Sequence, residues 1–296
     1  MGAPAAPLLQ AGARARERAR LRPRAPRGDR AIAPVALVTG ASSGIGRATA
    51  LRLLELGWSV CASVRRDGEA PPGTLELVFD VTDVEAIARA AAAIQELDAL
   101  VLNAGIAVAA PLEFLPPTEL TRQLDVNVVG QLRVLQSFLP ALRRRRGRVV
   151  LMGSIGGRSA LPFLGAYAMS KFALEAMADS LRVELAPSGI DVAIVEPGTI
   201  ATPMWTKPQR SLDDFPPAAA ELYGERTEKF RRLAARRSAT RAAPPREVAD
   251  AVVHALTAKT PRTRYVVGHD AKLRARVQRL PDRVRDRVLT RFLFGE

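Results

Sequence analysis

The chain has 296 residues, of which 48% are hydrophobic and 25% charged, a composition typical of a soluble globular protein with one large α/β domain or two small ones. No stretch reaches the roughly 18 uninterrupted apolar residues of a membrane-spanning helix. The single cysteine excludes an intrachain disulfide and suits a reducing compartment, so we expect a cytoplasmic protein.

The net charge of +14 is concentrated at the two ends. Residues 1–33 carry eight arginines against two acidic residues, a net +6, and residues 271–296 carry eight basic against three acidic residues, a net +5. The region between is nearly neutral, which argues against a specific nucleic-acid groove within the fold.

Residues 1–33 are rich in Ala, Arg and Pro without a regular apolar period, so we predict a disordered tail. The tail lacks the compact apolar stretch of a secretory signal. A transit peptide would share the arginines but carry more serine, and an over-extended start site is another interpretation.

From residue 34 onward, apolar strand patterns alternate with helical ones. Such alternation predicts a single doubly wound Rossmann-type domain over 34–270, in which helices cover both faces of a parallel sheet of about seven strands. The predicted strands are 35–38, 59–64, 75–79, 99–102, 148–152, 191–195 and 265–267, and the predicted helices are 45–56, 84–96, 120–142 and 167–185.

Two segments interrupt this alternation. Residues 201–243 form a long excursion after a strand, with a mixed helix around 221–236, and predict a lid over the substrate. Residues 271–296 have apolar positions at helical spacing among arginines and predict a basic amphipathic helix. A packing or oligomer-contact role is favoured for it over peripheral contact with an anionic membrane.

A glycine-rich turn lies between the first strand and the first helix. Its glycines permit a tight turn and close approach to a phosphate, and the helix start favours an anion, so we predict a dinucleotide site. Arg47 and Ala48 stand where a P-loop would have Lys and Ser or Thr. The predicted contacts are Gly40, Ser42, Ser43, Gly44, Ile45 and Gly46.

Three further strand ends complete the predicted cofactor site. Arg65 and Arg66 follow the second strand, where an acidic residue would favour NAD(H), so NADP(H) is favoured; an arginine pair without a ligand is the alternative. Asp80 and Val81 would reach the adenine edge, although the aspartate could equally belong to a turn. The segment Asn103-Ala104-Gly105 closes the fourth strand with small residues.

Tyr167 and Lys171 are one helical turn apart, and Ser154 precedes the tyrosine by thirteen residues. A nearby ammonium would lower the pKa of the phenol and suit it to general acid and base catalysis. Taken alone, the pair could also be a surface i, i+4 contact.

Together these motifs resemble the short-chain dehydrogenase/reductase family over 35–268, in a branch similar to 17β-hydroxysteroid and retinol dehydrogenase-like members. Leu102 departs from the family's Asn-Asn-Ala-Gly motif. The resemblance implies a homodimer or homotetramer, a nicotinamide-binding loop at Pro197, Gly198, Ile200 and Thr202, and a catalytic set of Asn127, Ser154, Tyr167 and Lys171.

The resemblance implies that Tyr167 transfers the proton, Ser154 holds the reacting oxygen, Lys171 acts on the phenol and binds ribose, and Asn127 anchors a water. We therefore expect an NADP(H)-dependent oxidoreductase on an apolar secondary alcohol or ketone, steroid- or retinoid-like, without a metal. The alternatives are a 3-oxoacyl thioester reductase, a non-catalytic dinucleotide-sensing protein, and nucleic-acid association through the arginine-rich ends.

Overall fold

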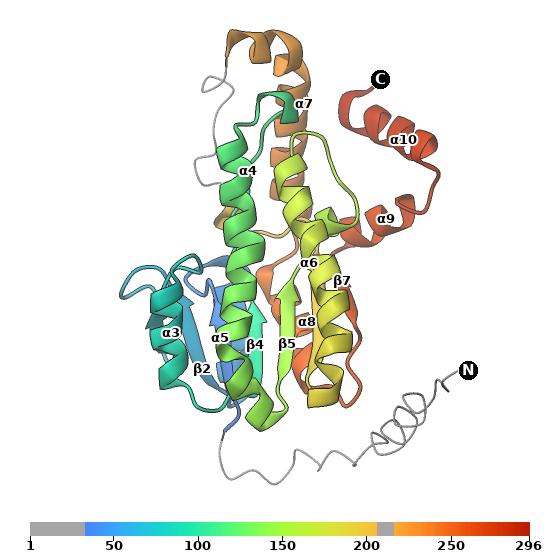
Figure 1. Cartoon of the computed structure of the whole chain (residues 1–296). Coiled ribbons are helices and arrows are strands. Elements are labelled where there is room, and N and C mark those ends of the chain that lie inside the picture. The colour runs from blue at the N-terminus through green and yellow to red at the C-terminus, as the bar shows by residue number, and fades with distance from the viewer. Residues whose placement is uncertain (1–32, 206–215) are drawn as a thin grey trace, which may run out of the picture. The chain divides into compact units, whose positions relative to one another are not determined.

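A computed structural model describes residues 33–205 and 216–296 (Figure 1). One compact unit spans Pro34–Glu296. The predicted disordered tail falls outside the described residues except for Ala33, and so does the stretch 206–215 of the predicted lid.

A seven-stranded parallel sheet in the order β3-β2-β1-β4-β5-β6-β7 forms the centre of this unit. The doubly wound fold predicted from the alternating pattern is therefore confirmed. The strands are β1 (Val35–Thr39), β2 (Ser59–Val64), β3 (Leu75–Val78), β4 (Ala99–Leu102), β5 (Arg148–Met152), β6 (Asp191–Pro197) and β7 (Arg264–Val267).

The central strands β1, β4 and β5 are mostly apolar because both of their faces are covered. Leu37 and Leu100 belong to the core on one face of the sheet, whereas their neighbours Val38 and Val101 belong to the core on the other. In Figure 1 the first face, with α3, α5 and α6, is turned to the viewer, while α2 and α8 pack on the far face. The helices are α2 (Gly44–Glu55), α3 (Val84–Ala93), α4 (Pro117–Leu124), α5 (Gly130–Arg145), α6 (Gly165–Glu184), α7 (Pro217–Arg241), α8 (Pro245–Thr257), α9 (His269–Val277) and α10 (Asp282–Phe294).

The structure divides two segments that were predicted as single helices. The predicted helix 120–142 consists of α4, a π-helical turn η2 (Asp125–Val129) and α5. The predicted helix 271–296 consists of α9 and α10, which are separated at Pro281. Proline has no amide hydrogen and disfavours a helical conformation at the residue before it, so it begins a new helix instead of continuing the old one.

The predicted lid contains α7, which is longer than the helix expected around 221–236. The two ends of the segment 201–243 lie side by side, because Ile200 and Ala243 form a parallel β-bridge. Among the described residues, no helix combines the length and apolar character needed to cross a membrane.

Candidate active site

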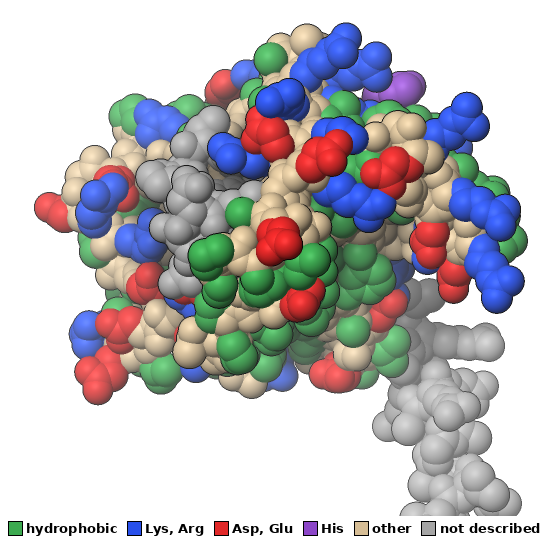
Figure 2. Space-filling model, turned by 90° about the horizontal axis from the view of Figure 1, so that it is seen from above, with side chains coloured by type: hydrophobic (Ala, Val, Ile, Leu, Met, Phe, Trp, Pro, Cys, Tyr) green, Lys and Arg blue, Asp and Glu red, His purple; other side chains and the backbone are tan. Residues whose placement is uncertain are grey.

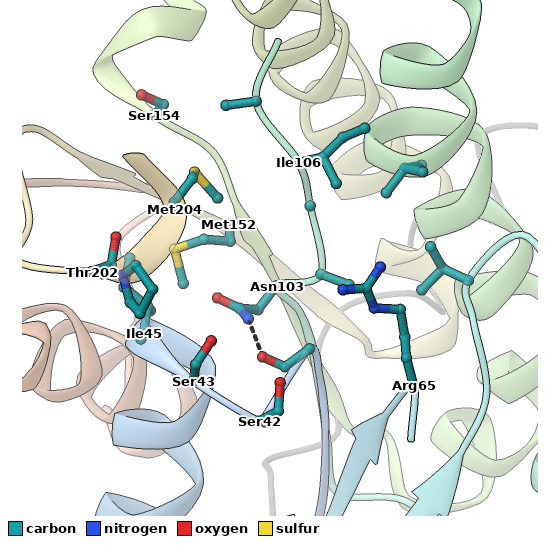
Figure 3. Close-up of a pocket in the computed structure, with 18 of the residues that line it drawn as sticks. Ser42, Ser43, Ile45, Arg65, Asn103, Ile106, Met152, Ser154, Thr202 and Met204 are labelled. Carbon is teal, nitrogen blue, oxygen red and sulfur yellow. Dashed lines mark hydrogen bonds between the residues drawn. The ribbon is translucent and has the colours of Figure 1, made fainter. Parts of the chain in front are cut away.

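A cavity of about 670 Å³ opens at the carboxyl ends of the strands. This is the edge at which open α/β sheets bind their ligands. Figure 3 shows Ser154 and Arg65 on opposite sides of it, with Ser42 and Ser43 below. The structure brings these predicted residues into its lining: Gly40, Ser42, Ser43, Gly44, Ile45, Arg65, Asp80, Val81, Asn103, Ala104, Gly105, Ser154, Tyr167, Lys171, Pro197, Gly198, Ile200 and Thr202.

Two predicted residues, Gly46 and Asn127, do not line the cavity but support its wall. A Cβ atom on Gly46 would lie 2.3 Å from the Gly40 carbonyl oxygen and 2.5 Å from Asn103 Nδ2. Gly46 thus serves close packing between α2 and the strand ends. The lining also includes residues that sequence reasoning missed, among them Ile106, Met152 and Met204, whose apolar side chains carry no motif.

The glycine turn after β1 has the shape of a phosphate cradle. Gly40 and Gly44 have φ angles of +64° and +55°, a region that side chains other than glycine rarely adopt. Gly44 and Ile45 begin α2 and line the cavity, and Ser43 before them makes no side-chain cap. The first N–H groups of a helix lack intrahelical partners, so this end of α2 suits an anionic pyrophosphate.

Thr39 and Asn103 hold this cradle against the end of β4. Thr39 Oγ1 accepts hydrogen bonds from the backbone N–H groups of Asn103 and Ala104, both at 2.9 Å. The Asn103 side chain in turn donates to the carbonyl oxygens of Thr39 at 2.8 Å and Gly40 at 3.2 Å. A buried threonine and one asparagine therefore set the distance between the two strand ends.

The two arginines after β2 have different surroundings. Arg66 pairs with Glu69 at 2.5 Å, whereas Arg65 lines the cavity, is exposed and pairs with no acidic residue in the described part of the chain. Asp80 lines the cavity too, but one of its oxygens accepts from the Thr82 amide and hydroxyl at 2.9 and 2.7 Å. Asp80 therefore stabilises a turn, as considered above, and also lines the cavity.

Ser154, Tyr167 and Lys171 lie at the other side of the cavity, and all three are buried. Ser154 Oγ accepts from the Gly156 amide at 3.0 Å and also hydrogen-bonds to Tyr167. Lys171 Nζ donates to the Met152 carbonyl oxygen at 2.7 Å and lies 5.6 Å from the centre of the Tyr167 ring. The predicted i, i+4 pair therefore faces the interior, not the solvent.

Burial has the largest effect on the ionisation of both residues. It lowers the pKa of Lys171 to about 8 and raises the pKa of Tyr167, while the Ser154 hydrogen bond and the charge of Arg274 act to lower the latter. The expectation of a lowered tyrosine pKa is thus wrong for this structure, because desolvation of the phenolate outweighs the nearby cation. The cation that acts on Tyr167 is Arg274 of α9. Its proximity to the tyrosine could not be inferred from the spacing of the two residues in the sequence.

Asn127 lies in the π-helical turn η2. Its Oδ1 accepts from the Ile106 amide at 2.8 Å, and its Nδ2 donates to the Ile106 carbonyl oxygen and to Ser170 Oγ, both at 3.0 Å. Ser170 Oγ donates to the Tyr167 carbonyl oxygen at 2.7 Å. Both N–H groups of Asn127 therefore have partners, and the side chain links the loop after β4 to α6.

Two further buried amides, Gln123 and Gln131, support the same loop. Gln123 accepts from the Val108 amide at 2.7 Å and donates to the Ile106 carbonyl oxygen at 2.8 Å, and Gln131 donates to the Ala104 carbonyl oxygen. Sequence reasoning missed both glutamines, although amides recur every four residues at 123, 127 and 131.

Five aromatic side chains form a cluster between the segment before α6, α7 and the chain end. Phe163 makes edge-to-face contacts with three rings, at centroid distances of 5.7 to 6.3 Å. Tyr223 also contacts Phe114, and its hydroxyl donates to Glu113 at 2.7 Å. This aromatic cluster joins α7 and the chain end to the segments before α4 and α6, and its members are Phe114, Phe163, Tyr223, Phe230 and Phe294.

The sequence model described as short chain dehydrogenase matches residues 34–212. The chain belongs to the short-chain dehydrogenase family. Its curated relatives include human 17-beta-hydroxysteroid dehydrogenase type 1, 38% identical over 256 residues that cover 78% of this chain and 76% of that protein. Retinol dehydrogenase 5 of Mus musculus is 37% identical over 282 residues, which cover 86% of each chain.

Solved structures agree with this assignment. A short chain dehydrogenase from Burkholderia cenocepacia J2315, in complex with NADP, has a TM-score of 0.70 and 30% identity, covering 87% of this chain and 97% of that one. As a short-chain dehydrogenase, this protein is an oxidoreductase that acts on CH–OH groups with a nicotinamide cofactor. The glycine cradle, with positive φ angles at Gly40 and Gly44 and the start of α2 at the cavity, fits such a dinucleotide.

Proposed function

We propose that this protein is an NADP(H)-dependent dehydrogenase or reductase of an apolar secondary alcohol or ketone, with Tyr167 as general acid and base. The supporting observation is the cavity itself. It has buried Ser154, Tyr167 and Lys171 on one side and the glycine cradle with Arg65 on the other. A dinucleotide would lie between them.

The residues on the catalytic side have complementary functions. The bound nicotinamide supplies or accepts the hydride. Ser154 holds the reacting oxygen by a hydrogen bond, and Tyr167 donates its proton to that oxygen during reduction or removes it during oxidation. Lys171, anchored on the Met152 carbonyl oxygen, keeps a positive charge beside the phenol as the pH falls below about 8.

The preference for NADP(H) rests on Arg65. A guanidinium that lines the cavity without an acidic partner in the described residues can pair with a 2′-phosphate, and the NADP complex of the Burkholderia relative supports this choice. Replacing Arg65 by Gln should weaken NADPH binding about tenfold or more, since a charge-assisted hydrogen bond contributes roughly 1.5–3 kcal/mol. NADH binding should stay unchanged, and Arg66→Gln is the matched control.

The apolar substrate is supported by the apolar side chains of Ile106 and Met204 in the cavity wall. The names of the steroid and retinol dehydrogenases among the relatives favour a steroid- or retinoid-like alcohol. The test is a screen of NADP and NADPH with steroids, retinoids, aliphatic ketones and 3-oxoacyl esters. Turnover of the 3-oxoacyl esters alone would instead indicate a thioester reductase.

The catalytic assignment is tested with Tyr167→Phe. This variant should lose at least about 100-fold in turnover, as expected for removal of a general acid, while NADPH affinity changes little. Retained activity would refute the assignment. Absence of turnover in the wild-type protein, with NADPH still bound, would favour a dinucleotide-sensing protein.

We also propose a homodimer or homotetramer. Its support is the exposed apolar surface of α6, which includes Met169, Phe172 and Val183 at 40%, 44% and 74% exposure. Light scattering should give a mass of two or four chains, and Val183→Asp should reduce it. A monomer at micromolar concentration would contradict this proposal.

A further inference from the structure

The helix α10 and the turn that precedes it at 278–280 expose two adjacent rows of side chains with the same four-residue spacing. We define the apolar stripe as Leu280, Val284, Val288 and Phe292, which are 39%, 43%, 43% and 50% exposed. We define the arginine row as Arg279, Arg283, Arg287 and Arg291, all of which are exposed. Residues four apart lie on one face of a helix, and a shift of one residue places the second row directly beside the first.

The remaining sides of α10 have other partners. Leu293 is buried against the body of the protein. Asp282 and Asp286, on the side away from the apolar stripe, pair with Arg285 at 3.0 and 3.5 Å. In the described part of the chain, no acidic residue pairs with the arginine row. Figure 2 shows Lys and Arg side chains next to hydrophobic and acidic ones along the right-hand rim, the side on which α10 lies in Figure 1.

We propose that the apolar stripe and the arginine row form a docking surface for an anionic lipid bilayer, with α10 lying in the plane of the interface. A helix that exposes an apolar stripe flanked by arginines matches the acyl boundary and the anionic headgroups at the same time. A second copy of the chain fits less well, because a two-fold contact across the stripe would bring two arginine rows together.

The docking surface is connected to α7 of the predicted lid and to the aromatic cluster, and here the inference rests on the proposed function. Arg237 of α7 lies over the Phe292 ring at 4.6 Å from its centre. Arg226 of α7 pairs with Glu296, and Phe294 contacts Phe163 of the aromatic cluster. A bilayer against α10 would therefore lie close to the lid, where an apolar alcohol dissolved in the membrane can enter.

The first test uses the full-length protein with Phe292→Trp and vesicles of phosphatidylcholine with or without phosphatidylserine. The new tryptophan keeps an aromatic ring beneath Arg237 and reports on the stripe itself. In vesicles that contain phosphatidylserine, we expect brominated acyl chains to quench the tryptophan fluorescence of Phe292→Trp more than that of the wild-type protein. In phosphatidylcholine vesicles we expect little quenching of either protein. Vesicle binding without this quenching would show adsorption through another basic segment, such as residues 1–33, and would overturn the proposal.

The second test distinguishes the effect of the arginine row from the effect of the protein's net charge. Changing Arg283, Arg287 and Arg291 together to Gln should weaken binding to phosphatidylserine vesicles by about tenfold or more, given the contribution of each arginine near an anionic surface. The control changes three exposed arginines elsewhere, Arg89, Arg143 and Arg231, to Gln. Equal weakening in both variants would contradict a specific surface.

A fluorescence change that depends on protein concentration, without vesicles, would indicate a second copy on the stripe and would also overturn the proposal. Neither assay contains cofactor or alcohol. A protein that shows the quenching but no turnover would refute the proposed function and leave the docking surface standing.

Discussion

The hydroxyl of Thr39 offers a quantitative test of how the site is assembled. Thr39 is fully buried at the end of β1, and its Oγ1 is the acceptor for two backbone N–H groups at 2.9 Å. Thr39→Val preserves the branched shape that suits a strand but replaces this acceptor with a methyl group. The N–H groups of Asn103 and Ala104, which are partly buried, would then lose this partner.

Leaving a fully buried polar group unsatisfied costs about 1–3 kcal/mol; because these two groups are partly buried, we expect a loss toward the lower end, about 1–3 kcal/mol in total, in the free energy of unfolding. Thr39→Ser is the control because it keeps the hydroxyl and removes only a methyl group, at a cost of about 1 kcal/mol. The difference between the two variants isolates the hydroxyl, and their buried volumes differ little from the wild type.

Urea titrations followed by circular dichroism measure both variants against the wild type. Hydrogen exchange should show faster exchange at the Asn103 and Ala104 amides in Thr39→Val alone. NADPH binding should weaken in that variant as well, since Asn103 also holds the glycine turn. If Thr39→Val were as stable as Thr39→Ser and protected both amides equally, the bridging function of this hydroxyl would be refuted.

Three further predictions follow from ionisation. Between pH about 8 and 10.4, the free energy of unfolding should rise more steeply with pH in the wild type than in Lys171→Met, as measured by urea titrations at stepped pH. Burial lowers the pKa of Lys171 in the folded protein to about 8, so the unfolded state binds more protons than the folded state in this pH range. Arg274→Gln should raise the pKa of Tyr167 and move the acid limb of alcohol oxidation to higher pH, whereas a pH profile of Arg276→Gln should match the wild type. Cys61 should react with iodoacetamide at pH 8 only as fast as the protein opens, because burial raises its pKa to about 11; rapid labelling of the folded protein would contradict this.

Local sequence patterns were sufficient to predict an element where all of its residues have the same surroundings. The apolar runs of β1, β4 and β5 predicted buried parallel strands because both faces of each strand meet a hydrophobic core. The turn at Gly40 and Gly44 could likewise be predicted, since its positive φ angles depend on the residues themselves. Both inferences concern backbone conformation, which neighbouring residues largely determine.

The π-helical turn η2 shows where such reasoning failed. Helical periodicity assumes 3.6 residues per turn, so the segment 120–142 was predicted as one helix. Asn127, within the turn, bonds to Ile106 and Ser170 from other elements. Tertiary partners of this kind are invisible in the local pattern.

The amino-acid sequence by itself determined the order of strands and helices, the glycine cradle and the residues that gather at the cavity, because these depend on periodicity, backbone preference and spacing. Tertiary structure alone decided which charges act on the phenol. Arg274 is 107 residues from Tyr167 in the chain, yet it lowers the tyrosine pKa while burial raises it. Electrostatic effects depend on distance through space and on desolvation, and only the packing of α9 against the core sets both.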